Sequence, residues 1–118
     1  MKELKKEFRE KFPYLKLEFY KGRHEDGKPS PATNQLDDSK KIGEVRTIHK
    51  EGELQVRGNM KVSTFENRFR EQYGLNVQVF RRSGNIWLQT TTTDHWTLAR
   101  QNGKGERSEK AYKEMHGK

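Results

Sequence analysis

The chain has 118 residues, of which 29% are hydrophobic and 36% charged, with a formal net charge of +8 at pH 7. This length suits one domain with a small core, and the absence of cysteine excludes disulfides and thiolate metal sites. The sequence shows neither a run of about 18 apolar residues nor a signal-peptide pattern. We therefore expect a soluble cytoplasmic protein that binds no membrane and needs no cofactor.

The first predicted elements are a helix and a strand. Leu4, Phe8 and Phe12 recur at helical spacing, which predicts a helix over residues 2–12 that ends before the following proline. Apolar and polar residues then alternate, which predicts a half-buried strand near 14–20.

The next stretch carries weaker signals. Residues 21–36 are rich in glycine, proline and polar side chains, which predicts a loop within 21–41 that is either functional or mobile. A short helical turn is expected through Ile42 to Val45, and a short strand at 53–57.

The strongest helix pattern covers residues 62–73. Gly74 follows at the place where a left-handed residue ends a helix. Ser63 and Glu66 have the spacing of a capping box, and Glu66 is otherwise expected on the exposed side of the helix. The apolar positions of the stripe are Val62, Phe65, Phe69 and Tyr73.

A β-hairpin is predicted next, with strands near 75–82 and 85–91. Its turn is either Ser83-Gly84 or the next residue pair, Gly84-Asn85. We favour Ser83-Gly84, because it places Val79 opposite Leu88 on the face that meets the helices. We expect a shift of the turn by one residue to break this sorting of side chains.

The other face of the hairpin is the candidate partner-binding surface. Interface hot spots are enriched in Trp and Arg, and aromatic rings beside arginine also suit the stacking of single-stranded bases, with Arg81 and Arg82 at the phosphates. Alternatively, a helix covers Phe80 and Trp87 as a second small core. Tyr20 joins this face if the first strand neighbours the hairpin. The predicted contact residues are Gln78, Phe80, Arg82, Trp87 and Gln89.

The C-terminal part is predicted to contain little structure. Asp94 is expected to cap a short helix near 95–102, which Asn102-Gly103 ends. Residues 104–118 have almost no apolar face, so we expect a flexible tail that is disordered or weakly helical.

These elements predict a single two-layer α+β domain over residues 1–103. Its helices pack on one face of a mostly antiparallel sheet, because the helix stripes and the strand faces each need an apolar partner. The segments 2–20 and 62–82 read as two copies of one helix–strand unit.

No pattern in the sequence points to catalysis. The four histidines are scattered without metal-ligand spacing, and no nucleophile–base pair or phosphate-binding glycine loop is present. We expect no catalytic residue and no metal site. The sequence favours a non-enzymatic binding or accessory module with a protein partner, which it contacts through the hairpin face or the loop at 21–36. The alternative is a single-stranded nucleic-acid-binding domain that uses the aromatic and basic sheet face.

The segments VQVFRRSGNIWLQTTTTDHWTLARQN, LKKEFREKFPYLKLEFY and GEVRTI resemble a group of small uncharacterised proteins of Bacteroidota. The resemblance covers most of the chain apart from residues 21–36 and the tail. It implies one compact intracellular α+β domain, and it implies no activity.

Overall fold

The computed structural model describes residues 2–20, 35–36 and 56–116. The loop residues 21–34, the predicted turn at 42–45 and residues 53–55 lie outside this range, and residues 56–57 of the predicted 53–57 strand are in no strand. The elements along the chain are α1 (Lys2–Lys11), β1 (Leu15–Tyr20), α3 (Val62–Tyr73), β2 (Asn76–Ser83), β3 (Ile86–Gln89), a 3-10 turn (Thr91–Thr93) and α4 (Leu98–His116).

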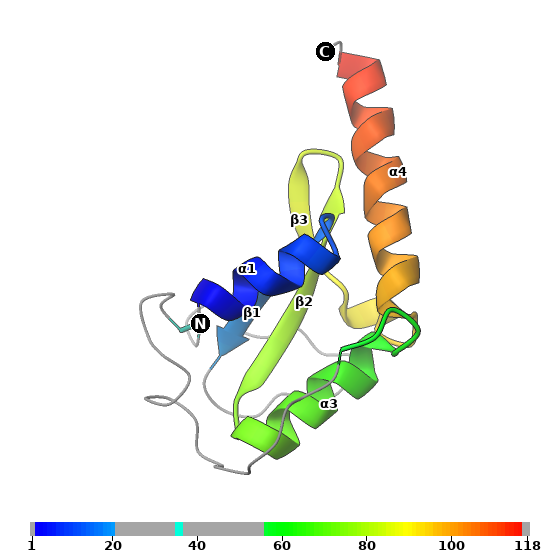
Figure 1. Cartoon of the computed structure of the whole chain (residues 1–118). Helices are drawn as coiled ribbons and strands as arrows, with labels where there is room; N and C mark the ends of the chain where they lie inside the picture. The colour runs from blue at the N-terminus through cyan, green and yellow to red at the C-terminus, as the bar shows by residue number, and fades with distance from the viewer. Residues whose placement is uncertain (1, 21–34, 37–55, 117–118) are drawn as a thin grey trace.

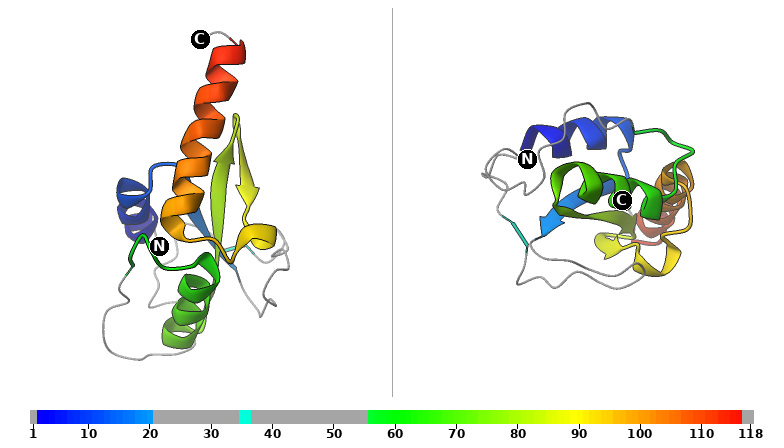
Figure 2. Two further views of the ribbon diagram at one scale, coloured as in Figure 1. Left: turned by 90° about the vertical axis from the view of Figure 1, so that its right-hand side faces the viewer. Right: turned by 90° about the horizontal axis from the view of Figure 1, so that it is seen from below.

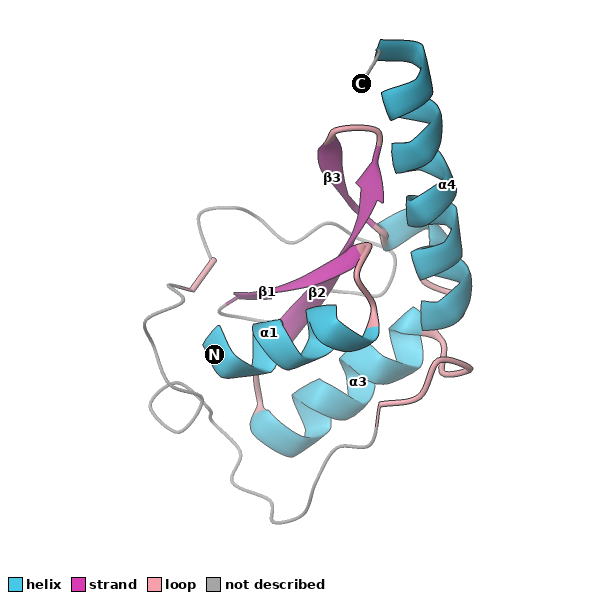
Figure 3. Cartoon of the chain, turned by 45° about the horizontal axis from the view of Figure 1, so that its top comes forward, coloured by secondary structure: helices cyan, strands magenta, loops and turns pink. Residues whose placement is uncertain are grey.

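The three strands form one antiparallel sheet in the order β1-β2-β3. Helices α1 and α3 lie on one face of this sheet (Figures 1 and 3). The predicted two-layer α+β architecture is therefore confirmed, and α1, β1, α3 and β2 lie close to their predicted bounds.

The core lies between these helices and the sheet. Aromatic side chains connect these elements. Phe8 of α1 stacks on Phe65 of α3 at 5.5 Å between ring centroids, which joins the two helices. Phe69 of α3 packs on Phe19 of β1 at 5.4 Å, which joins the helix layer to the sheet. The alternating strand residues complete it, namely Leu15, Leu17, Phe19, Val77 and Val79.

The pairing of β1 with β2 agrees with the predicted repeat. Leu17 pairs with Val79, and Phe19 pairs with Val77. If Leu17 corresponds to Val77 and Phe19 to Val79, exchanging the two units turns each pair into the other. The two helix–strand units thus meet in a symmetric register.

The start of α3 differs from the prediction. Lys61 is its N-cap and makes no side-chain capping bond, so the Ser63–Glu66 capping box is wrong. Instead, the Val62 and Ser63 N–H groups donate to the carbonyl oxygens of Trp96 and Asp94, at 2.9 and 2.8 Å. At the start of α4, the N–H groups of Leu98 and Ala99 donate to the carbonyls of Met60 and Gly58 in the same way, both at 2.9 Å. The two helix starts therefore cap each other.

Glu66 is only 8% exposed, which also contradicts its predicted position on the helix surface. Its carboxylate accepts the Val79 N–H at 3.1 Å and lies 3.4 Å from the Gln78 amide nitrogen. The reason is the short β3. Strand β3 ends at Gln89. Thr90 donates to the Val79 carbonyl, but the Thr90 carbonyl does not accept the Val79 N–H. The Glu66 carboxylate takes the place of the missing strand carbonyl, because a buried N–H group needs an acceptor.

The hairpin turn is Gly84-Asn85, with Gly84 at a φ of 60°, and the favoured Ser83-Gly84 turn is wrong. Phe80 pairs with Gln89, and Leu88 lies opposite Arg81 instead of Val79. A shift of the turn by one residue moves the register by two, so each side chain keeps its face and our expectation of broken sorting was also wrong.

Helix α4 is much longer than predicted. Thr97 caps it, since its Oγ1 accepts the Arg100 N–H at 3.1 Å, and the helix continues through Asn102-Gly103 to His116. Both the Asp94 cap and the predicted end at Gly103 are therefore wrong, and residues 104–116 of the predicted flexible tail are helical.

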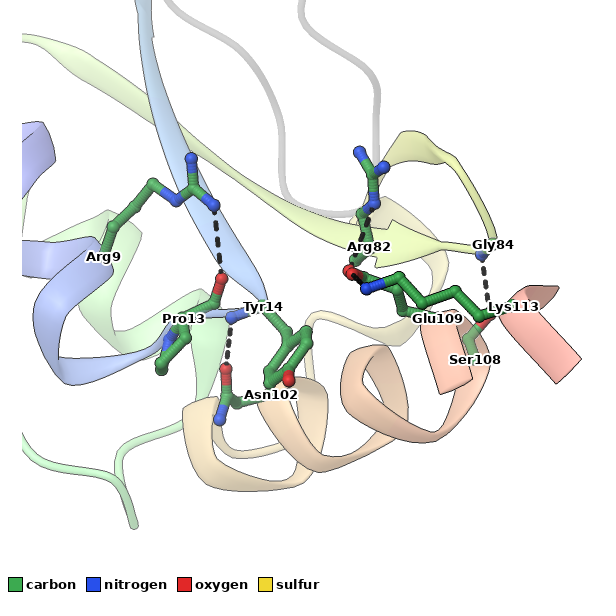
Figure 4. Close-up of polar contacts among 9 residues, drawn as sticks. All are labelled: Arg9, Pro13, Tyr14, Arg82, Gly84, Asn102, Ser108, Glu109 and Lys113. Atoms are coloured by element: carbon green, nitrogen blue, oxygen red, sulfur yellow. Dashed lines mark hydrogen bonds and ion pairs between the residues drawn. The ribbon is translucent and has the colours of Figure 1, made fainter. Parts of the chain in front are cut away.

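Polar contacts and a buried glycine hold α4 against the sheet. The Tyr14 N–H donates to Asn102 Oδ1 and the Gly84 N–H donates to Ser108 Oγ, each at 2.8 Å (Figure 4). Gly105 is buried, and a Cβ atom there would lie 2.9 Å from Tyr14 Cβ. Glycine is thus required by the close approach of this helix, which projects beyond the sheet (Figure 2).

Candidate interaction surface

The strand register places the predicted contact residues on one face of the sheet. Along β2 this face carries Gln78, Phe80 and Arg82, and it continues onto β3 with Trp87 and Gln89. On β1, Lys16 pairs with Phe80, Glu18 with Gln78 and Tyr20 with Asn76, so these β1 residues share the same face.

The half of this face farthest from the hairpin turn is buried. Gln78 is 1% exposed and Tyr20 is 2% exposed, so neither side chain is available to a partner. Glu18 is also buried, and it accepts bonds from Lys5 Nζ and from Gln35 Nε2. Burial raises the pKa of Tyr20 to about 12, and the negative charge of Glu18 adds to this rise. This half therefore serves stability.

The half nearer the turn is accessible. Phe80 and Trp87 are each partly exposed and lie outside the core cluster. Helix α4 packs against Tyr14, Arg81 and the hairpin turn. The alternative in which a helix buries Phe80 and Trp87 as a second core is therefore wrong.

Three cations surround these two rings. Lys16 Nζ lies 5.1 Å from the Phe80 ring centroid and 5.4 Å from that of Trp87. The guanidinium carbons of Arg82 and Arg9 lie 5.2 and 5.0 Å from the Trp87 centroid. Each contact is within cation–π range. We call Arg9, Lys16, Phe80, Arg82 and Trp87 the hairpin patch.

One acidic side chain of α4 borders the hairpin patch. Glu109 pairs with Arg82 Nε at 3.4 Å and with Lys113 Nζ at 2.9 Å (Figure 4). The hydrogen bond from Lys113 lowers the pKa of the Glu109 carboxyl, and the positive charges of Lys113, Arg82 and Arg9 act in the same direction. Glu109 thus stays ionised, and it orients Arg82 beside Trp87.

Arg81 is directed to the opposite face of the sheet. Its Nη1 donates to Gln101 Oε1 at 3.1 Å, and it packs against Gly105 of α4. Burial lowers the pKa of this guanidinium. The expectation that Arg81 joins Arg82 in contacting phosphates is therefore not supported by its position.

Sequence alternation placed Phe80, Arg82 and Trp87 on this surface correctly, but it missed Arg9 and Lys16. Lys16 could have been found, because it precedes Leu17 in an alternating strand that pairs with β2. Arg9 comes from the last turn of α1, and its approach to Trp87 depends on the path of the chain around Pro13. No spacing in the sequence indicates that contact.

Other kinds of site find no support in the described part of the chain. There, no group of three His, Asp or Glu side chains could hold a metal ion. No described helix is long and apolar enough to cross a bilayer. The sequence matches no known family model, no curated protein and no solved structure. The resemblance to the Bacteroidota proteins stays a prediction.

Proposed function

We propose that this protein is a non-enzymatic binding module that contacts another protein through the hairpin patch. The observation that carries the proposal is the cluster of three cations over two partly exposed aromatic rings, outside the core. Such rings contribute little to the core, whereas aromatic and arginine side chains dominate the energy of protein interfaces.

The chemistry of the patch defines the partner. Arg9, Lys16 and Arg82 favour a surface that carries carboxylates, which would approach quickly under the attraction of a basic chain. The parts of Phe80 and Trp87 that stay exposed beside these cations would contact an apolar side chain of that partner. Burial of the rings strengthens each charge pair at their edge, because the local dielectric constant falls.

Two observations favour a protein over single-stranded nucleic acid. The cations already lie over the aromatic rings, so a stacking base would have to displace them. Arg81, one of the two expected phosphate contacts, faces α4 instead. The nucleic-acid function therefore stays the alternative that the experiment must separate.

The test uses the tagged full chain to capture partners from a lysate of the source organism. Trp87→Ala and Lys16→Glu should each lose the captured protein. Lys104→Glu is the matched control, because it makes the same change of charge at an exposed position of α4. Circular dichroism of each variant checks that the fold is intact.

Equal loss with Lys104→Glu would show that capture follows net charge, and the proposal would fail. A labelled single-stranded oligonucleotide, titrated at low and moderate salt, tests the alternative. Binding that falls with salt and loses about 1–3 kcal/mol in Trp87→Ala would establish base stacking at the patch and replace the protein partner.

A further inference from the structure

Strand β3 forms an edge of the sheet. It pairs with β2 on its inner side, and within residues 2–20, 35–36 and 56–116 no strand pairs with its outer edge. Figure 2 shows β3 on the outer side of the hairpin, away from α4. Ile86–Gln89 contains no charged residue and no proline, the devices that usually keep an edge strand from pairing with another chain.

The backbone of Trp87 points out from this edge. The Thr90 N–H donates to the Val79 carbonyl. Every second residue of β2 from Val79 onward, namely Arg81 and Ser83, therefore also directs its N–H and C=O groups toward β3. Arg82 belongs to the other set, since its N–H donates to Tyr14 O. Its partner Trp87 consequently directs N–H and C=O away from β2, whereas those of Ile86 and Leu88 are used in the hairpin.

Two apolar side chains flank this position on the face opposite the Trp87 ring. Ile86 is 58% exposed and Leu88 is 43% exposed. Among the described residues, Met115 is the one other large hydrophobic side chain that is exposed, and it lies near the end of α4. Exposed aliphatic residues on an unprotected edge strand are typical of a pairing surface.

We propose that β3 pairs with β3 of a second copy of this chain, antiparallel and centred on Trp87. In this register the two Trp87 residues exchange backbone hydrogen bonds across a two-fold axis. Ile86 of each copy then lies directly opposite Leu88 of the other, so the exposed aliphatic side chains cover each other. The surface is complementary to itself, which identifies the second copy as its partner.

Other symmetric registers of this strand cover fewer apolar side chains. A centre on Ile86 would place Leu88 opposite Gly84, and a centre on Leu88 would place Ile86 opposite the buried Thr90, so each would pair only one aliphatic residue, with its own copy. A centre between two residues would oppose an outward-directed residue to an inward-directed one, and apolar side chains to the Trp87 face.

The pairing would extend the surface of the proposed function, although it does not depend on that function. A two-fold axis perpendicular to the sheet keeps both hairpin patches on one side of a continuous sheet. A partner with two matching sites would then bind with increased avidity.

The first measurement is sedimentation equilibrium of the full chain at about 10 µM to about 1 mM, where so small an interface should associate. We expect a monomer–dimer equilibrium. Leu88→Lys should raise the dissociation constant by about tenfold or more, because it places a charge in both apolar pairs. Met115→Lys, which adds the same charge elsewhere, should leave the constant unchanged.

The second measurement tests the register by disulfide formation, which the absence of native cysteine allows. Ile86→Cys chains mixed with Leu88→Cys chains should cross-link under mild oxidation, because these positions face each other. Either variant alone should cross-link much less, since its own two copies are diagonal and too far apart. A chain that stays monomeric throughout would overturn the proposal. So would a dimer that Leu88→Lys leaves intact, or cross-linking that is no faster in the mixture.

Discussion

Alanine substitution at two glycines of α4 gives a direct test of how this helix is held. Gly103 and Gly105 both occupy its interior, where replacing glycine with alanine stabilises a helix by about 1 kcal/mol. At Gly103 the new Cβ would meet one neighbour within 4 Å, Arg107 Nη1 at 3.2 Å, and a long side chain can move aside. Gly103→Ala should therefore stabilise the protein by about 1 kcal/mol.

At Gly105 the same change creates a steric clash. The added Cβ would lie 2.9 Å from Tyr14 Cβ, 3.0 Å from the Tyr14 carbonyl oxygen and 3.2 Å from Arg81 Cγ. Forcing a methyl group into such a contact costs about 1–3 kcal/mol. This cost offsets the helix propensity, so Gly105→Ala should unfold more easily than Gly103→Ala by about 1–3 kcal/mol.

Urea and thermal unfolding followed by far-ultraviolet circular dichroism measure the difference. For a chain of this size it corresponds to about 3–15 °C between the two melting temperatures. If both variants gain stability equally, α4 does not rest on Tyr14. If neither variant changes the free energy of unfolding, the sequence-based prediction of a flexible segment after residue 103 would stand.

Three further predictions concern stability. Phe69→Ala should cost about 3–5 kcal/mol in urea unfolding, because Phe69 is 1% exposed among other core rings, and an unchanged midpoint would contradict the described core. Glu66→Ala should cost about 1–3 kcal/mol, because it leaves the Val79 N–H without its acceptor, while Glu71→Ala on the exposed side of α3 should change little. Folding should weaken by about 2–3 kcal/mol as the pH rises from about 10 to about 12, because unfolded tyrosine ionises there while Tyr20 keeps its proton. Tyr20→Phe should reduce that alkaline loss in unfolding titrations, and an equal loss in the variant would show that Tyr20 is not its source.

The elements that could be predicted are those whose apolar residues repeat. Phe65 and Phe69 indicated α3, and alternation around Leu17 and Val79 indicated the paired strands. The C-terminal part of α4 could not be found in this way, because beyond the buried Leu98 its contacts with the sheet come largely from Gly105 and from polar side chains such as Asn102.

The errors at Glu66 and at the hairpin turn have different causes. The spacing of Ser63 and Glu66 fits a local cap. However, the Asp94 carbonyl accepts the Ser63 N–H that Glu66 would bond in such a cap, and the Glu66 carboxylate bonds the Val79 N–H instead. The turn was misplaced because the hydropathy pattern shows which face of the sheet a side chain occupies, and this does not change when the strand register shifts by two residues. For the same reason, the predicted contact residues still share one face of the sheet.

The reciprocal capping of α3 and α4 has a consequence for motion. The first amide protons of a helix are normally the first to exchange with solvent, because helix ends fray. Here the amides of Val62, Ser63, Leu98 and Ala99 donate across to the other helix start, so neither start can fray alone. Their protons should exchange together and slowly, at a rate set by the separation of the two segments. Hydrogen exchange would thus reveal residues 58–63 and 94–99 as one cooperative unit, although they are distant in the chain.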